Sequence, residues 1–265
     1  MQTMYNTVGV AGAGAMGQGI AQIAVQAGST VKLFDTRPEA VARALKDIAG
    51  QWDRMLEKGR MDAATVQACK SRLHGVDSIA AMSGCHLVIE AIIERLDVKK
   101  TLFAELESVV GADTVLATNT SSLPVTSIAA GMKHPGRFAG YHFFNPVPLM
   151  KVVEVIAGLK TSQDVCARLS AYALQMGHKP VQAADTPGFI VNHAGRGYGT
   201  EALRVVNESV ADFATVDRIL RDQAQFAEAD QIGVGLGRCH ASGLGEVLEQ
   251  QGMACLLYTS DAADE

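Results

Sequence analysis

His142 and Glu154 are the side chains whose types and spacing most directly suggest chemistry. His142 lies in an apolar and aromatic stretch, residues 141–148, with Asn145 three positions later and Glu154 twelve positions later. If the glutamate holds one ring nitrogen, the imidazole tautomer is fixed and the other nitrogen can take a proton from a substrate hydroxyl. The ordinary alternatives are a core histidine bonded to a backbone carbonyl and a surface carboxylate on a strand. Because apolar residues flank Glu154 on both sides, we favour an oriented general base.

A glycine-rich loop near the start of the chain supplies what a pyrophosphate group requires. The loop follows an apolar run and opens a helix, so it combines a tight turn and a close backbone approach with amides at a helix N-terminus. The alternative is a flexible glycine-rich turn. The residues that we expect at a cofactor are Gly12, Gly14, Met16 and Gly17.

Asp35 ends the next apolar run and would select the cofactor. Its carboxylate can accept hydrogen bonds from both ribose hydroxyls and would repel a 2′-phosphate, which favours NAD over NADP. Arg37 points the other way, although an arginine here is more often a solvated residue at the start of a helix. Together with the glycine loop, Asp35 predicts an NAD-dependent oxidoreductase.

Polar residues also follow an apolar run at residues 115–118, namely Asn119, Ser121 and Ser122. Open α/β sheets bind ligands just past the carboxyl ends of their strands, and there a serine hydroxyl could bond to the reacting oxygen. The alternative is that these residues cap the helix that Pro124 begins.

Three more polar residues each have two interpretations. Asn192 could contact a substrate or be a buried helix amide with local partners. Glu94 and Lys99, near the start of an expected helix, could line a cofactor site or form an exposed charged pair.

The elements around these residues predict an α/β fold with a Rossmann-type doubly wound sheet. Residues 7–10, 16–27 and 30–35 have the pattern of strand, helix and strand, which predicts a parallel sheet. Two helices expected at residues 39–58 and 62–72 exceed the length of a simple crossover. We therefore expect a projecting helical pair that could touch a substrate.

The rest of the chain divides into three parts. An NAD-binding domain is placed at residues 1–185, and it should contain strands at 87–93, 115–118, 138–144 and 151–156 and helices at 97–110 and 162–176. After the last of these helices the β signal fades, and from Phe189 the pattern is helical. An incomplete all-α C-terminal domain is therefore placed at residues 186–225, and an atypical tail at 226–265.

Composition excludes several classes of protein. A net charge of −5 over 265 residues provides no basic field for nucleic acid, and no apolar run is long enough to span a membrane. We expect neither a signal peptide nor a transit peptide. Five scattered cysteines without a Cys-x-x-Cys pair favour a reduced, cytoplasmic compartment, and the other six histidines have no metal-ligand spacing, so no metal is expected.

Four motifs, taken in order and spacing, resemble the L-3-hydroxyacyl-CoA dehydrogenase family over about residues 7–222. They are the glycine loop, residues 119–123, residues 142–146 with Glu154, and residues 185–192. The resemblance implies reversible oxidation of an L-3-hydroxyacyl-CoA to the 3-ketoacyl-CoA with NAD. Residues 193–198 look like bacterial members that act in fatty-acid or aromatic-acid breakdown.

The same resemblance implies the roles of individual residues. It makes His142 and Glu154 the catalytic dyad and gives Ser121 and Asn192 a role in polarising the substrate. Lys58, on the projecting helical pair, becomes a contact for coenzyme A phosphates. The residues implied at the cofactor, beside the glycine loop, are Asp35, Glu94, Lys99, Ser121 and Asn145.

The chain departs from the family pattern after about Ala224, where a Gly-Pro-Phe element and a Gly-Leu-Asp turn are not found. We therefore interpret residues 226–265 as sequence foreign to the family, from a frameshift, a chimeric read or translated adapter. A truncated second domain would put the family's homodimer in doubt. Two other functions stay open: a gulonate-type sugar-acid 3-dehydrogenase, and a catalytically silent NAD-binding protein.

Overall fold

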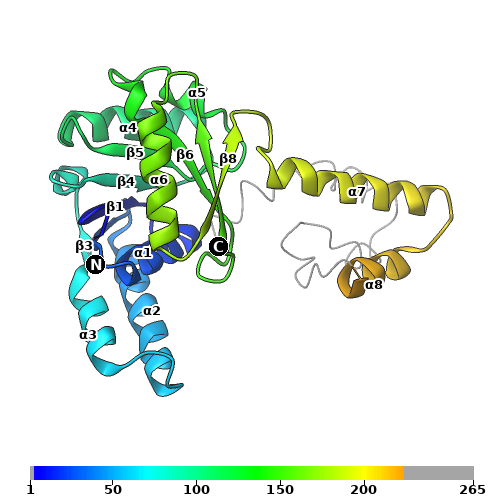
Figure 1. The fold of residues 1–265 in the computed structure, drawn as a ribbon, viewed down its shortest axis with the longest axis horizontal. Helices are drawn as coiled ribbons and strands as arrows, with labels where there is room; N and C mark the ends of the chain where they lie inside the picture. The colour runs from blue at the N-terminus through cyan, green and yellow to red at the C-terminus, as the bar shows by residue number, and fades with distance from the viewer. Residues whose placement is uncertain (1–2, 224–265) are drawn as a thin grey trace. The chain divides into compact units, whose positions relative to one another are not determined.

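The computed structural model describes residues 3–223, which form two compact units. The first unit ends at Pro187 and the second begins at Gly188 (Figure 1). The sequence-based expectation for residues 226–265 lies outside the described residues.

A mixed sheet of eight strands forms the centre of the first unit. Its order is β3-β2-β1-β4-β5-β6-β7-β8. Neighbouring strands from β3 through β6 pair in parallel, β7 is antiparallel to β6, and β8 is parallel to β7. The strands are β1 Thr7–Ala11, β2 Thr30–Phe34, β3 Leu73–Val76, β4 Leu87–Glu90, β5 Val115–Thr118, β6 Phe138–Phe143, β7 Val152–Ala157 and β8 Lys179–Ala184.

Helices cover both faces of this sheet, which is why its central strands are apolar on both sides. One face, formed by alternate residues such as Val10, Tyr141 and Val155, shares a single core cluster with α1, α2 and α6. On the other face, Phe103 of α4 packs edge-on against Phe138 of β6, with ring centroids 4.7 Å apart. The helices are α1 Ala15–Gln26, α2 Pro38–Glu57, α3 Ala63–Arg72, α4 Leu96–Val109, α5 Val125–Ala129 and α6 Gln163–Gln175, with short 3₁₀ turns η1 Ile79–Met82 and η2 Pro135–Arg137.

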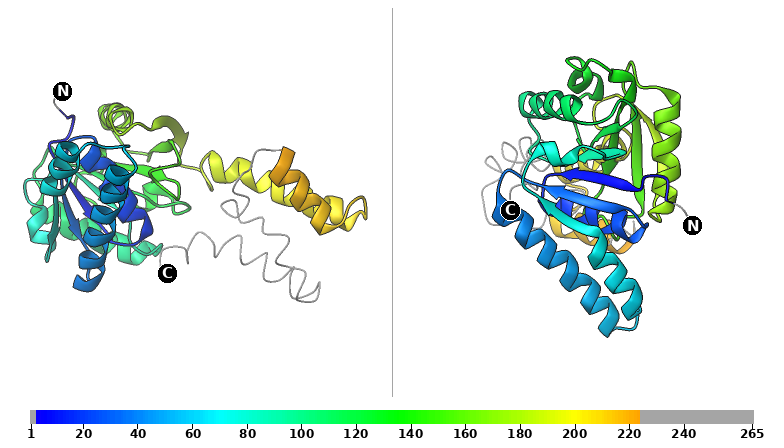
Figure 2. Two further views of the ribbon diagram at one scale, coloured as in Figure 1. Left: turned by 90° about the horizontal axis from the view of Figure 1, so that it is seen from below. Right: turned by 90° about the vertical axis from the view of Figure 1, so that its left-hand side faces the viewer.

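Helices α2 and α3 extend side by side from the sheet, as expected from their length (Figures 1 and 2). Pro38 begins α2, and Asp62 caps α3 by accepting a hydrogen bond of 2.7 Å from the amide of Thr65. Lys70 and Asp53 join the two helices, with 2.6 Å between Nζ and Oδ1. The pair therefore has its own internal supports.

Two strands, β3 and β8, were not predicted from the sequence, and β8 lies in the segment after residue 176 where the β signal fades. Both strands lie at edges of the sheet, where half-exposed residues replace the continuous apolar run of a central strand. β8 also contains Pro180, which cannot donate to a ladder and is tolerated on an edge strand. Their sequences therefore lack the apolar pattern that would have predicted a strand.

The second unit, as far as residue 223, contains α7 Val191–Asn207 and α8 Phe213–Gln223. Ala202 of α7 and Val216 of α8 are buried in a small apolar cluster of their own. Asp212 accepts a hydrogen bond of 2.8 Å from the amide of Thr215 at the start of α8. Within residues 3–223, no helix is long and apolar enough to cross a bilayer.

Candidate active site

His142 and Glu154 are register partners on the antiparallel strands β6 and β7. The imidazole Nδ1 lies 2.7 Å from Glu154 Oε2, and both side chains are buried. Because an ionised carboxylate only accepts, the contact makes Nδ1 the protonated nitrogen and assigns proton exchange to Nε2. At Nδ1, the partner is thus a carboxylate rather than the backbone carbonyl of the ordinary alternative.

The dyad lies on the face of the sheet that α4 and α5 cover. Alternate residues of β6 point to opposite faces, so His142 shares a face with Phe138 and Gly140. A Cβ atom at Gly140 would lie 2.9 Å from Val125 of α5, so this glycine allows the helix to pack closely beside the dyad. The ring of Phe144 lies 4.4 Å from the imidazole, between centroids, and helps to bury it.

The loop after β5 is attached directly to the strand that carries His142. Thr118 of β5 is the register partner of Gly140, and the Asn119 side-chain oxygen accepts a hydrogen bond of 2.9 Å from the amide of Phe143. Because the carboxyl ends of β5 and β6 meet at one edge of the sheet, Ser121 lies at the same edge as His142.

The residues of this loop do not cap α5, so the capping alternative is wrong. The amides of Val125 and Thr126 instead donate to the two carboxylate oxygens of Asp185, each at 2.8 Å. Asp185 lies sixty residues further along the chain, just after β8. Ser121 and Ser122 are therefore not needed at the start of the helix.

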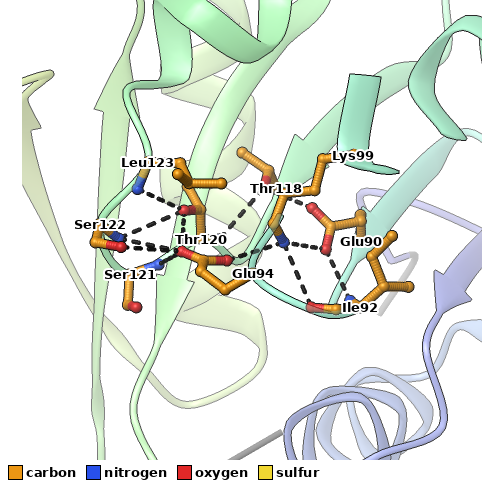
Figure 3. A network of polar contacts seen from close by, with 9 residues as sticks. All are labelled: Glu90, Ile92, Glu94, Lys99, Thr118, Thr120, Ser121, Ser122 and Leu123. Atoms are coloured by element: carbon orange, nitrogen blue, oxygen red, sulfur yellow. Dashed lines mark hydrogen bonds and ion pairs between the residues drawn. The ribbon is translucent and has the colours of Figure 1, made fainter. Parts of the chain in front are cut away.

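Glu94 organises the same loop through one of its carboxylate oxygens. Oε1 accepts hydrogen bonds from the amides of Ser121 and Ser122, at 2.9 and 3.3 Å, and from the hydroxyl of Thr120 (Figure 3). The backbone of Ser121, which follows β5, is thereby held by a carboxylate from the segment that follows β4.

Lys99 of α4 is a buried cation between two carboxylates. Its Nζ lies 2.5 Å from Glu90 Oε1 and 3.1 Å from Glu94 Oε2 (Figure 3). Burial alone would lower the pKa of the ammonium group, but the two carboxylates outweigh it and raise that pKa. Burial likewise opposes the charge of Glu94, yet Lys99 and the loop donors lower the pKa of its carboxyl. The alternative of an exposed charged pair is therefore wrong.

The glycine loop has the geometry that a dinucleotide phosphate needs. Gly12 has a φ of +111°, and a Cβ atom there would lie 2.3 Å from the carbonyl oxygen of Ala91. A Cβ atom at Gly17 would lie 1.8 Å from the carbonyl oxygen of Gly12. Within α1, whose N-cap is Gly14, the first turn has neither a side-chain cap nor an acidic residue, so its amides suit an anion. Met16 lies in this same turn.

Asp35 links the end of β2 to the glycine loop. Its Oδ2 accepts a hydrogen bond of 2.8 Å from the amide of Ala13, and its Oδ1 accepts one of 3.0 Å from the amide of Arg37. The Arg37 guanidinium lies 3.5 Å from the same carboxylate and is half exposed. The carboxylate therefore lies beside the loop, as an adenosine ribose contact requires, and these residues fit NAD.

Three further predicted site residues lie outside the strands of the dyad. Asn145 is exposed in the loop after β6, and Lys58 is exposed at the C-terminal end of α2, on the projecting pair. Asn192 lies in the first turn of α7, in the second unit. The roles of these three residues stay predictions.

Sequence reasoning missed Glu90, Thr118 and Asp185 as parts of the site's support. Glu90 ends the otherwise apolar strand β4, and a charge at the end of a fully buried strand was a usable signal. The two other residues have no local pattern that reveals partners far away in sequence. Among residues 3–223, no cluster of three metal-ligating side chains occurs.

The sheet, the glycine loop and the Asp35 contact together define a dinucleotide-binding domain of the Rossmann class. Residues 7–186 match the model of the 3-hydroxyacyl-CoA dehydrogenase NAD-binding domain, and residues 188–262 match that of the family's C-terminal domain. The chain belongs to the 3-hydroxyacyl-CoA dehydrogenase family.

Three similar proteins illustrate this membership. The chain is 45% identical over 226 residues to a 3-hydroxyadipyl-CoA dehydrogenase of Escherichia coli, a match that covers 85% of the chain but only 48% of that protein. It is 40% identical to a probable 3-hydroxybutyryl-CoA dehydrogenase of Bacillus subtilis, with 85% and 80% covered. The structure of an (S)-3-hydroxybutyryl-CoA dehydrogenase from Ralstonia eutropha superposes with a TM-score of 0.82 at 31% identity, covering 98% of the chain and 90% of that protein.

Proposed function

We propose that this protein oxidises the 3-hydroxyl carbon of an L-3-hydroxyacyl-CoA with NAD, giving the 3-ketoacyl-CoA. The observation that carries the proposal is the buried contact of 2.7 Å between His142 Nδ1 and Glu154 Oε2 within an NAD-binding domain. A buried imidazole with a fixed tautomer is what removal of a hydroxyl proton requires.

The dyad would act as follows in the direction of oxidation. His142 takes the hydroxyl proton through Nε2, and Glu154 stabilises the imidazolium that results. The glycine loop and Asp35 would hold NAD, which would supply the acceptor for the hydride that leaves the carbon. Ser121, whose amide is held by Glu94, donates a hydrogen bond from its hydroxyl to the same substrate oxygen. In the reverse direction the imidazolium returns the proton.

The other predicted residues have binding roles in this proposal. Asn145 lines the cofactor site, Lys58 contacts coenzyme A phosphates from the projecting helical pair, and Asn192 helps to polarise the substrate. Lys58 is exposed, so its ammonium can meet an anion without rearrangement of the core.

The acyl group is proposed to be short, because similar proteins include a 3-hydroxybutyryl-CoA and a 3-hydroxyadipyl-CoA dehydrogenase. The adipyl group is the longer of the two and ends in a carboxylate, whereas the butyryl group ends in a methyl group. The relatives also include α subunits of fatty acid oxidation complexes, which favours a place in fatty-acid breakdown. A reduced cytoplasmic setting belongs to the proposal, since Cys69, Cys85 and Cys166 are buried thiols. A family-type homodimer stays an expectation.

The test is NADH formation by the full chain with three substrates: 3-hydroxybutyryl-CoA, 3-hydroxyadipyl-CoA and gulonate. We expect turnover with one or both thioesters and none with gulonate. Turnover of gulonate alone would make the protein a sugar-acid dehydrogenase. If NADH bound normally while no substrate turned over, the protein would be a silent NAD-binding protein.

A further inference from the structure

The ammonium group of Lys99 is fully engaged by oxygen atoms of its own chain. It faces Glu90 Oε1 at 2.5 Å, Glu94 Oε2 at 3.1 Å and the carbonyl oxygen of Ile92 at 3.5 Å (Figure 3). An ammonium group has three protons to donate, and the side chain is only 1% exposed. Lys99 therefore cannot donate to a bound cofactor without losing one of these contacts.

Glu94 connects Lys99 to the loop after β5. Its Oε2 faces Lys99, whereas its Oε1 receives the donors of Thr120, Ser121 and Ser122. A mostly buried carboxylate stays ionised only when charge and hydrogen bonds compensate for its lost hydration. The position and the charge of this acceptor consequently depend on Lys99.

Glu90 fixes Lys99 and reaches the same loop by a second route. Its Oε1 also accepts a hydrogen bond of 2.7 Å from the amide of Ile92, and its Oε2 accepts one of 2.6 Å from the Thr118 hydroxyl. The Thr118 oxygen in turn accepts from the amide of Thr120 at 3.2 Å. Both carboxylates of the Glu90–Lys99–Glu94 triad are thus connected by hydrogen bonds to the loop that carries Ser121.

We propose that Glu90 and Lys99 are positioning residues that act through Glu94 and Thr118 to hold Ser121 where its hydroxyl meets the substrate oxygen. This inference rests on the proposed function, because it assigns the triad to the Ser121 step of that reaction. The role that the family resemblance gave Lys99 at the cofactor then becomes indirect. Neither residue touches the reacting atoms.

The first experiment measures the loop itself and does not require activity. Amide hydrogen exchange of residues 119–123 is compared between the full-length wild type, Lys99→Met, the milder near-isosteric Glu90→Gln, and the control Asp97→Asn. Asp97 forms an exposed ion pair with Arg95 at the start of the same helix. We expect faster exchange in residues 119–123 for both triad variants, with residues 12–17 unchanged, and no change for the control. Unchanged exchange of the loop in a folded triad variant would overturn the proposal.

The second experiment separates positioning from direct cofactor contact. For Lys99→Met and Glu90→Gln we expect kcat to fall about tenfold to a hundredfold, as for other small displacements of a site. The Kd of NADH should stay within about twofold of the wild-type value, because the ammonium group of Lys99 donates to oxygen atoms of its own chain. A twofold change in Kd corresponds to less than about 0.5 kcal/mol. A raised Kd with unchanged kcat would instead make Lys99 a direct cofactor ligand.

A double-mutant cycle with Ser121→Ala completes the test. If the triad acts through Ser121, Lys99→Met should reduce kcat less in the Ser121→Ala background than in the wild type. Multiplicative losses would contradict the coupling. If the wild type turned over no 3-hydroxyacyl-CoA, the proposed function would fail, while the exchange experiment would still decide whether the triad holds the loop.

Discussion

Glu154 faces His142 across the antiparallel strands β6 and β7, with 2.7 Å between the carboxylate oxygen and the ring nitrogen. Direct register partners are held by the ladder itself, so the pair needs no loop to bring it together. The geometry is therefore set by the backbone pairing of two strands, which suits a group that must exchange a proton repeatedly.

Replacement of Glu154 by glutamine should reduce turnover far more than it changes binding. Glutamine keeps the shape of the side chain but lacks the charge that stabilises the imidazolium, and it can also select the wrong tautomer. We expect kcat for 3-hydroxybutyryl-CoA to fall about 10²- to 10⁴-fold. The exposed Glu105→Gln is the control and should leave kcat unchanged. An unaltered kcat in Glu154→Gln would remove the glutamate from the dyad.

Asp35→Ser should relax the preference for NAD. The substitution removes the charge that repels a 2′-phosphate, while the neighbouring Arg37, half exposed, becomes available to bind that phosphate. We expect the ratio of kcat/KM for NADP to that for NAD to rise about tenfold or more. Asp113→Ser, in an exposed turn, is the matched control. A constant ratio would show that Asp35 does not select the cofactor.

Gly17→Ala should disrupt the phosphate loop by steric overlap. The new methyl group would lie 1.8 Å from the carbonyl oxygen of Gly12, so the backbone of the loop must move. We expect a loss of stability of about 1–3 kcal/mol, typical of overpacking, together with weaker NADH binding. Thermal unfolding and NADH titration measure the two effects. Gly131→Ala meets no atom within 4 Å and should be nearly neutral in both assays.

Acidification should weaken the contribution of Glu94 to stability. Burial disfavours its charge, but Lys99 and the loop donors lower the pKa of this carboxyl in the folded protein. A carboxyl whose pKa is lowered on folding stabilises the fold at pH values above its pKa in the unfolded chain, about 4.3. This stabilisation is lost as the pH falls through the pKa of the folded state. The free energy of unfolding, measured with urea, should therefore differ most between the wild type and Glu94→Gln near neutral pH, and the two values should converge below about pH 4. A pH-independent difference would contradict this.

The buried parts of the fold were predictable from the sequence, whereas its edges were not. Apolar runs such as 115–118 identified central strands, because a strand covered on both faces has no polar side. The edge strands β3 and β8 lack such runs. The direction of β7 and β8, opposite to that of the other strands, depends on the pairing of β7 with β6, which no local sequence pattern reveals.

The candidate site was predictable where its partners are close in sequence. Glu154 lies beside His142, as the spacing suggested, although their catalytic roles stay predictions. The contacts of Asp185 with the start of α5 join residues about sixty positions apart, and no local signal reveals them. Lys99 was placed near the cofactor, but only the folded structure shows that carboxylates surround its ammonium group.

The most direct test of His142 as the base is NADH formation from 3-hydroxybutyryl-CoA by the wild type and by His142→Gln at saturating NAD. We expect the variant to fold and to bind NADH within about twofold of the wild type, while kcat falls about 10²- to 10⁴-fold because the proton acceptor is gone. Turnover by His142→Gln at the wild-type rate would contradict the assignment of His142 as the base.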